Sequence, residues 1–230
     1  EGEPRWIELT TIAPPAPRRN HAAAYDPVHN RLILYSGCLG GCLPIDDRVY
    51  VLANANGLGG PPTWTQLATV GGPPAARVIH TVSYDAATNR LIVYGGHDGV
   101  RHEFADAWVL TEANGLGGAP TWIAVAPVGE LPHARANHSA MYDAAHNRLI
   151  VFAGSAAGTE LTDIWALDHA NGLGGTPAWT QIVSDRTPPF GVGVYDVATD
   201  RMLVFGGNES AGMSNQVFEL SHASGSAGPS

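Results

Sequence analysis

Lysine is absent from this sequence of 230 residues, so all 12 of its basic residues are arginine. They are outnumbered by 21 acidic residues, which gives a formal net charge of −9. A negative chain without a basic run repels a phosphate backbone on average. We therefore expect no nucleic-acid partner.

Long hydrophobic runs are also missing. No apolar stretch approaches the roughly 20 residues that a membrane-spanning helix requires, so we expect no transmembrane segment. Glycine and proline are plentiful instead, with 28 and 17 residues. This composition suits an all-β fold of many short strands and turns.

Cysteine occurs only twice, at Cys38 and Cys42. Two thiolates exclude a four-cysteine zinc site but leave a disulfide loop, a redox pair or half of a metal site. Gly40 and Gly41 between them allow so short a loop to close, and we expect a disulfide. Because disulfides persist in oxidising compartments, this predicts an extracellular or periplasmic protein.

A thirteen-residue segment recurs four times along the chain. Each copy contains a strand that ends in Tyr-Asp, a tight turn, and an apolar strand followed by glycine. The short Asp side chain at the turn is suited to accept hydrogen bonds from backbone amides ahead of it. Four copies predict four similar supersecondary units. The copies are Tyr25–Gly37, Tyr84–Gly96, Tyr142–Gly154 and Tyr195–Gly207.

Other positions recur with the same period. A tryptophan begins a short strand in each unit, and we expect its ring to fill the space between sheets. An Asn-Gly-Leu-Gly-Gly connector leads to three of the tryptophans, and we expect these connectors on the face opposite the variable loops. Each unit thus supplies four short antiparallel strands. The tryptophans are Trp6, Trp64, Trp122 and Trp179, and the units span approximately 6–63, 64–121, 122–178 and 179–230.

The paired glycines after an apolar strand, the Tyr six positions before Arg, and the spaced Trp residues resemble kelch repeats, which form β-propeller blades. The resemblance covers nearly the whole chain and implies one all-β domain over 1–230, with four four-stranded antiparallel blades. We expect Trp6–Leu9 to complete the last blade beside Val217–Leu220, because closure removes exposed sheet edges. The alternatives are a segment of a larger propeller or half of a propeller built from two chains.

Positions that break the repeat are the best candidates for function, since those that recur in every unit serve the blade. The loop after the second glycine pair gathers His, Asp, Arg and Glu, a set suited to partner contacts, metal binding or acid–base chemistry. In kelch propellers, such loops share one rim with the Pro-rich connections that follow each Trp strand, and partners bind there. The candidate residues in this loop are His97, Asp98, Arg101, His102 and Glu103.

Three further residues are candidates outside that loop. Arg77 and Arg135 each precede a histidine by three positions, and arginine is suited to anionic ligands. The alternative is structural, with each arginine tying a turn to the next blade. Phe190 lies in the fourth unit, which is shortened at this point, and is a candidate to line an opening in the rim.

These observations favour a non-catalytic, secreted or periplasmic binding module whose rim loops contact a protein or glycan partner. We expect no cofactor, no metal and no catalytic residue. One alternative is a small carbohydrate-active enzyme, mutarotase-like or lyase-like, that uses Arg77, Arg135, His102 and Glu103 at the propeller mouth. Another is a structural subunit of a larger complex that assembles through the connector leucines, which are Leu58, Leu116 and Leu173.

Overall fold

The computed structural model describes residues 3–100, 102–186, 190–209 and 212–225. Within these ranges the chain forms strands and turns and contains no helix. None of the described residues therefore belongs to a helix that is long and apolar enough to cross a membrane.

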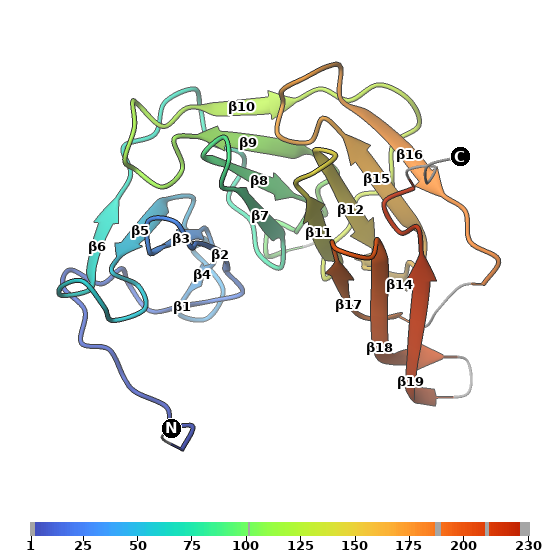
Figure 1. The fold of residues 1–230 in the computed structure, drawn as a ribbon, viewed down its shortest axis with the longest axis horizontal. Helices are drawn as coiled ribbons and strands as arrows, with labels where there is room; N and C mark the ends of the chain where they lie inside the picture. The colour runs from blue at the N-terminus through green and yellow to red at the C-terminus, as the bar shows by residue number, and fades with distance from the viewer. Residues whose placement is uncertain (1–2, 101, 187–189, 210–211, 226–230) are drawn as a thin grey trace.

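Four antiparallel sheets follow one another along an arc (Figure 1). Each continuous apolar strand that the sequence predicts lies inside its sheet, with a partner on both sides. Sheet 1 contains β2 (Ala22–Asp26), β3 (Arg31–Tyr35), β5 (Val49–Ala53) and β6 (Thr63–Gln66). Sheet 2 contains β7 (Thr81–Asp85), β8 (Arg90–Tyr94), β9 (Ala107–Thr111) and β10 (Trp122–Val125). Sheet 3 contains β11 (Ser139–Asp143), β12 (Arg148–Phe152), β15 (Ile164–Asp168) and β16 (Ala178–Ile182). Sheet 4 contains β17 (Phe190–Asp196), β18 (Arg201–Glu209) and β19 (Gly212–Ser221).

Each Trp strand is the outer strand of the sheet that precedes it. Trp64 lies opposite Leu52, and Trp122 opposite Leu110. The ring of Trp122 packs on Tyr35 of sheet 1, with 5.1 Å between ring centroids, and Trp179 packs on Tyr94 at the same distance. The large rings therefore fill the space between neighbouring sheets, as the sequence predicts.

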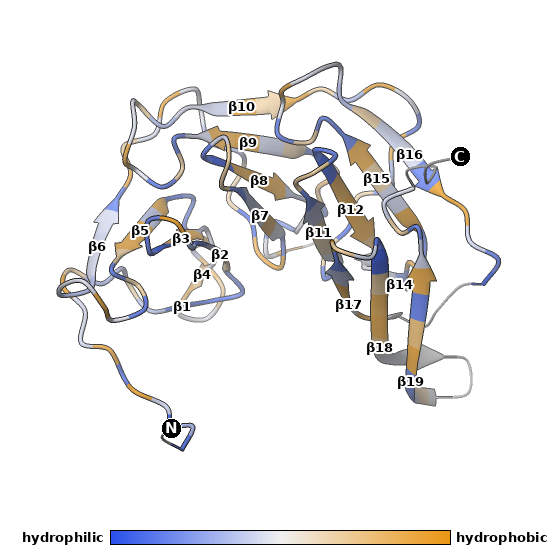
Figure 2. Cartoon of the chain, in the orientation of Figure 1, coloured by the Kyte–Doolittle hydropathy of each residue, from blue (hydrophilic) through white to orange (hydrophobic). Residues whose placement is uncertain are grey.

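Most of the core lies in these joints between sheets. Isoleucine, leucine, valine and aromatic side chains from facing sheets form three buried clusters, one for each joint. Figure 2 shows hydrophobic residues concentrated in inner strands such as β8, β12 and β18. Because each sheet buries its faces against its neighbours, sheets 1 and 4 each keep one face without a neighbouring sheet among the described residues.

The predicted closure by the first strand is wrong for this structure. Trp6–Leu9 forms no strand, Trp6 is fully exposed, and the outer edge of β19 pairs with no described residue. The residues that follow this segment join the other end of the arc, where the Ile12 carbonyl accepts a 2.9 Å hydrogen bond from the Trp64 amide. Figure 1 shows the N-terminal segment beside sheet 1 and far from β19, so the described part of the chain forms an open arc.

The turn aspartates and the glycine pairs act as the sequence indicates. Asp26 Oδ1 accepts hydrogen bonds from the amides of Val28 and His29, at 3.0 and 3.2 Å. Gly96 has a φ of +93°, and a Cβ at this position would lie 2.8 Å from the Val78 carbonyl oxygen. Glycine is required there because both the backbone conformation and the close approach exclude a side chain.

Candidate interaction site

Three variable loops lie at one end of the sheets, where β3, β8 and β12 end. Each loop pairs with the Pro-rich connection of its own unit, so loops and connections share one rim, as the kelch resemblance implies. The pairing is through β1 (Arg18–Arg19) and β4 (Cys38–Leu39) in the first unit, and through single bridges from Val78 to His97 and from Ala136 to Ser155 in the next two. The Asn-Gly-Leu-Gly-Gly connectors lie at the opposite end of the strands, as predicted.

The connections are also bonded to one another around the rim. The Ile79 amide donates to the Asn20 carbonyl, and the Asn137 amide donates to the Ile79 carbonyl, both at 3.1 Å. This chain of backbone hydrogen bonds links three units. It gives the variable loops a common rigid base.

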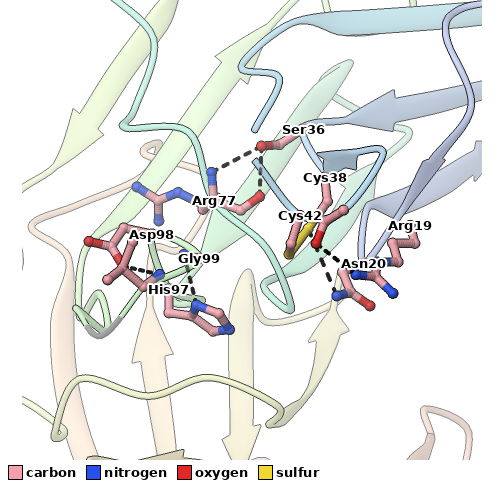
Figure 3. Close-up of a disulfide and its surroundings, with 11 residues drawn as sticks. Arg19, Asn20, Ser36, Cys38, Cys42, Arg77, His97, Asp98 and Gly99 are labelled. Atoms are coloured by element: carbon pink, nitrogen blue, oxygen red, sulfur yellow. Dashed lines mark hydrogen bonds between the residues drawn. A yellow bond between two sulfur atoms is a disulfide. The ribbon is translucent and has the colours of Figure 1, made fainter. Parts of the chain in front are cut away.

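The predicted disulfide between Cys38 and Cys42 is confirmed. Figure 3 shows the bridge on the loop of the first unit, close to His97 and Gly99 of the second. The two loops are in contact, because a Cβ on Gly99 would come within 2.8 Å of Ile45 Cδ1. The disulfide loop therefore supports one side of the second loop.

Polar residues of the second loop hold the loop in shape. Asp98 Oδ1 accepts hydrogen bonds from the Val100 and His102 amides, at 2.8 and 3.1 Å. His97 Nδ1 accepts one from the Gly99 amide at 2.9 Å. The loop also reaches its other neighbour, because Glu103 Oε1 accepts a 3.1 Å hydrogen bond from the amide of Ala157 in the third loop.

The three loops consequently form one continuous surface with a hollow in it. The hollow has a volume of about 340 Å³. Its lining mixes apolar, amide, imidazole and carboxylate groups from the second and third units. No three His, Cys, Asp or Glu side chains within the described ranges lie close enough to hold a metal ion. The lining residues are Ile79, His97, Val100, Glu103, Ala136, Asn137 and Ser155.

Exposed apolar side chains on this rim were not among the candidates from the sequence. Leu43 is 62% exposed and Val100 is 68% exposed, each on a loop that contacts its neighbour. Two large apolar groups beside a polar hollow are typical of a protein-contact surface. In the sequence, the sign of such a contact residue is an apolar side chain within a Gly- and Asp-rich loop. This pattern is too common to identify a contact residue by itself.

Arg77 and Arg135 lie in the interior and are fully buried. Arg77 binds the Asp106 carboxylate through two nitrogens, at 2.7 and 2.9 Å, and donates to the Gly95 carbonyl at 3.0 Å. Arg135 repeats this arrangement with Asp163, at 2.8 and 2.9 Å. The described contacts therefore commit both guanidinium groups to structural partners, and neither contributes to the rim surface.

These ion pairs set the charge state of the two carboxylates. Burial opposes ionisation of Asp106 and Asp163, but hydrogen bonds from the arginines outweigh it and hold the pKa of each carboxyl below its usual range. Both acids are ionised at neutral pH. A bidentate Arg–carboxylate pair satisfies the planar guanidinium more completely than a single contact would.

Two candidates cannot be placed by their side chains. Arg101 lies outside the described residues. The backbone of Phe190 begins β17, but its side chain also lies outside the described part of the chain. Of the sequence candidates, the structure brings together His97, Asp98, His102 and Glu103 on one loop.

Repeated four-stranded antiparallel sheets joined through Trp rings, with one rim of dissimilar loops, define a propeller-type repeat module. A family model described as the KLHDC2/KLHL20/DRC7 Kelch-repeats domain matches residues 39–224. The chain belongs to the kelch-repeat family. Kelch-repeat domains are protein-interaction modules, and the dissimilar rim loops agree with this general role.

Several curated proteins are similar to this chain. A leucine-zipper-like transcriptional regulator 1 homolog of Drosophila melanogaster is 29% identical over 165 residues, which is 69% of this chain and 16% of the relative. Adagio-like protein 3 of Oryza sativa subsp. japonica is 28% identical over 234 positions, which is 96% of the chain and 35% of the relative. The Rab9 effector protein with kelch motifs of Homo sapiens is 34% identical over 91 residues, which is 40% of the chain and 23% of the relative. The chain thus matches about a third or less of the length of each.

Proposed function

We propose that this chain is a non-catalytic interaction module that binds a protein partner through the joined rim loops 38–47, 97–106 and 155–163. The observation that supports this most directly is the contact between neighbouring loops. Ile45 packs on Gly99, and Glu103 accepts a hydrogen bond from Ala157. Three loops of different sequence therefore present one surface on a repetitive scaffold, which is the usual division between support and recognition.

A protein suits this surface better than a glycan. The exposed side chains of Leu43 and Val100 offer apolar contact area, and Val100 lines the hollow together with His97 and Glu103. Apolar anchors beside a polar rim are typical of protein interfaces. The net charge of −9 favours a partner surface that is basic or neutral.

Charged substitutions on the rim test the proposal. Leu43→Asp together with Val100→Asp should weaken partner binding by more than tenfold, because each carboxylate replaces an apolar contact and must lose its hydration when the interface forms. The matched control is Leu116→Asp, an exposed leucine (52%) on a connector at the other end of the sheets. Partners retained by the wild-type chain would be identified by mass spectrometry and their affinities measured by calorimetry.

The outcomes are distinct. Loss of binding in the rim variant but not in the connector variant supports the proposal. A partner lost only through Leu116→Asp, or a glycan bound on an array with the rim variant unaffected, would overturn it.

We also propose that the chain works outside the cytosol, because the disulfide between Cys38 and Cys42 requires an oxidising environment to persist. The test is the thiol state of protein taken from its native source, measured by alkylation and mass spectrometry. Fully alkylated cysteines would overturn this proposal without affecting the rim proposal.

A further inference from the structure

The first two joints between neighbouring sheets repeat one set of polar contacts. In the first joint, the Tyr84 hydroxyl and the Asn114 side-chain amide both donate to Asp26 Oδ2, at 3.2 and 2.9 Å. Arg31 Nη1 completes the set by donating to the Asn114 carbonyl at 3.0 Å. In this joint, the Asp and the Arg belong to the earlier sheet, and the Tyr and the Asn that bond to them belong to the next sheet.

The second joint has the same three contacts. The Tyr142 hydroxyl and the Asn171 amide donate to Asp85 Oδ2, at 3.4 and 2.8 Å. Arg90 Nη1 donates to the Asn171 carbonyl at 3.0 Å.

The third joint keeps two of the three contacts. The Tyr195 hydroxyl donates to Asp143 Oδ2 at 3.4 Å. Arg148 donates to the Ser224 carbonyl. Ser224 replaces the Asn there and donates to Asp200 of its own sheet. The full set therefore occurs in two of the three joints.

At each end of the arc, the outer sheet carries one half of this contact set without the other half facing it among the described residues. Sheet 1 presents Tyr25 and Asn56 on its outer side, which we call the head face, and their described hydrogen bonds stay within sheet 1. Sheet 4 presents Asp196 and Arg201 on its outer side, which we call the tail face, and theirs stay within sheet 4. The head face therefore has the Tyr and Asn, and the tail face has the matching Asp and Arg.

Apolar positions at the two ends match in the same way. On the tail face, Phe205 lies opposite Val217 and both are largely exposed, at 61% and 66%. The equivalent pair in sheet 1 is Tyr35 opposite Val49, which is buried under Trp122 of the next sheet. The head face carries the equivalent tryptophan, Trp64, which is only half-buried.

The unpaired edge of sheet 4 has a matching strand as well. In sheets 1 to 3 the outer strand carries a Trp, and in sheets 2 and 3 its ring packs on a Tyr of the preceding sheet. Among the described residues, β19 has no such outer strand beside it. A cavity of about 360 Å³ is open at this place, and Ile164, Met202, Val204 and Leu220 are among the residues that line it. Trp6, the tryptophan without a sheet, is fully exposed.

We propose that the tail of one copy binds the head of a second copy of this chain. Trp6–Leu9 of the second copy adds to β19 as an antiparallel strand, with Trp6 opposite Leu220 and its ring in the cavity. This register is the one that places Trp64 opposite Leu52 and Trp122 opposite Leu110. We infer that the strand comes from a second copy, because the first copy's own N-terminal segment lies beside sheet 1, far from β19 (Figure 1).

The faces then stack as the internal joints do. Tyr25 and Asn56 of the second copy donate to Asp196, and Arg201 donates to the Asn56 carbonyl. The exposed pair Phe205 and Val217 forms the strip that receives Trp64. Figure 2 shows that β18 and β19 both contain hydrophobic residues. The contact is head-to-tail, so two copies form a closed ring of eight sheets if the rotation closes, and a longer assembly if it does not.

The mass in solution tests the proposal. Multi-angle light scattering and analytical ultracentrifugation of the full chain should show association that grows with concentration. Trp6→Ala should weaken association at least tenfold while leaving the circular dichroism spectrum unchanged, because Trp6 is exposed in the single chain. The matched control is Leu131→Ala, which removes another exposed apolar side chain, 57% exposed, away from both end faces. A chain that stays monomeric at hundreds of micromolar, or association unaffected by Trp6→Ala, would overturn the proposal.

A cross-link tests the register. Ile7 of the second copy should lie directly opposite Glu219, so Ile7→Cys and Glu219→Cys proteins are prepared separately, mixed and oxidised gently. A disulfide peptide joining positions 7 and 219, found by mass spectrometry in a two-chain product, supports the proposal. A second protein carries both Ile7→Cys and Glu219→Cys on one chain. If it forms this bond only within single chains, the occupant of the β19 edge is the chain's own segment and the proposal fails.

Discussion

The side-chain amide of Asn114 donates a 2.9 Å hydrogen bond to the carboxylate of Asp26, 88 positions earlier and in the neighbouring sheet. Both side chains are buried. Burial opposes ionisation of Asp26, but hydrogen bonds from Asn114 and His29 outweigh it and lower the pKa of the carboxyl. One charged group therefore fixes its own turn and joins two sheets.

Replacing Asn114 by Asp should break the joint between sheets 1 and 2. The substitution keeps the acceptor oxygen but removes the donor and sets a second negative charge against Asp26. We expect the free energy of unfolding to fall by about 2 kcal/mol or more, since a hydrogen bond to a charged buried group is lost. Urea unfolding followed by fluorescence would measure the change.

Asn56→Asp provides the control for that prediction. Asn56 occupies the same place in its connector and accepts the equivalent hydrogen bond from the Leu58 amide, as Asn114 does from the Leu116 amide. Its described hydrogen bonds stay within sheet 1, so the loss should be much smaller when both variants are measured in dilute solution. Equal losses would show that the connector turn, and not the contact between sheets, carries the effect.

Arg77→Lys should be strongly destabilising although it conserves charge. A single ammonium group cannot bind both oxygens of Asp106 and also reach the Gly95 carbonyl, as the buried guanidinium does. We expect a loss of about 3 kcal/mol in the free energy of unfolding, because one buried charge is left incompletely paired. Thermal or urea unfolding measures it.

Arg48→Lys is the comparison for Arg77→Lys, because Arg48 also pairs with an aspartate but has an exposed side chain. Its replacement should leave the midpoint of unfolding nearly unchanged. If both variants change the midpoint of unfolding equally, the bidentate contact of the buried Arg77 guanidinium adds no more stability than the exposed pair. A selective loss of partner binding in a stable Arg77→Lys protein would instead return Arg77 to the list of contact residues.

The repeated residues allowed most of each sheet to be predicted from the sequence, because Asp turns, glycine pairs and apolar strands are local signals. The contacts between sheets were harder to predict from the sequence. Asp26 was expected to fix a turn, but its contacts with Tyr84 and Asn114 depend on how two sheets stack. Sequence spacing does not show how close side chains of two neighbouring sheets will lie.

The rim site and the ends of the arc also contain features that the sequence did not reveal. His97 to Glu103 stood out by composition, whereas Leu43 and Val100 became candidates only when exposure and loop contacts were known. The position of Trp6 was predicted from the repeat alone, which specifies the partner of a Trp strand but not whether that partner belongs to the same chain. In this structure the N-terminal segment lies beside sheet 1 and far from β19 (Figure 1).

The disulfide should contribute modestly to stability and more to the shape of the rim. A loop this short restricts the unfolded chain little, so Cys38→Ser with Cys42→Ser should lower the free energy of unfolding by about 2 kcal/mol. The second loop rests on this one through Ile45 and Gly99, so proteolysis near Val100 should become faster. Limited proteolysis with mass spectrometry measures the local effect, and the wild-type chain treated with reductant should match the double variant. Unchanged cleavage near Val100 would show that the second loop holds its shape alone.

Two buried histidines should make the protein sensitive to mild acid. Burial, with a further contribution from nearby arginine, lowers the pKa of His80 and of His138 from 6.5 to about 3. Both ring nitrogens of His80 lack a hydrogen-bond partner among the described residues, so nothing offsets the cost of charging it.

The sign of the pH dependence follows from where protons bind. Between pH 6.5 and 3, His80 and His138 bind protons in the unfolded chain but stay neutral in the folded chain. The free energy of unfolding must therefore decrease as the pH falls through this window. Each histidine should contribute a slope of up to about 1.4 kcal/mol per pH unit. Urea unfolding at several pH values from 7 to 4.5 should therefore give a shallower slope for His80→Gln and His138→Gln than for the wild-type chain. His133→Gln, which changes an exposed histidine, should leave the slope as it is. A wild-type slope near zero between pH 6 and 4.5 would mean that both buried imidazoles accept protons in the folded state.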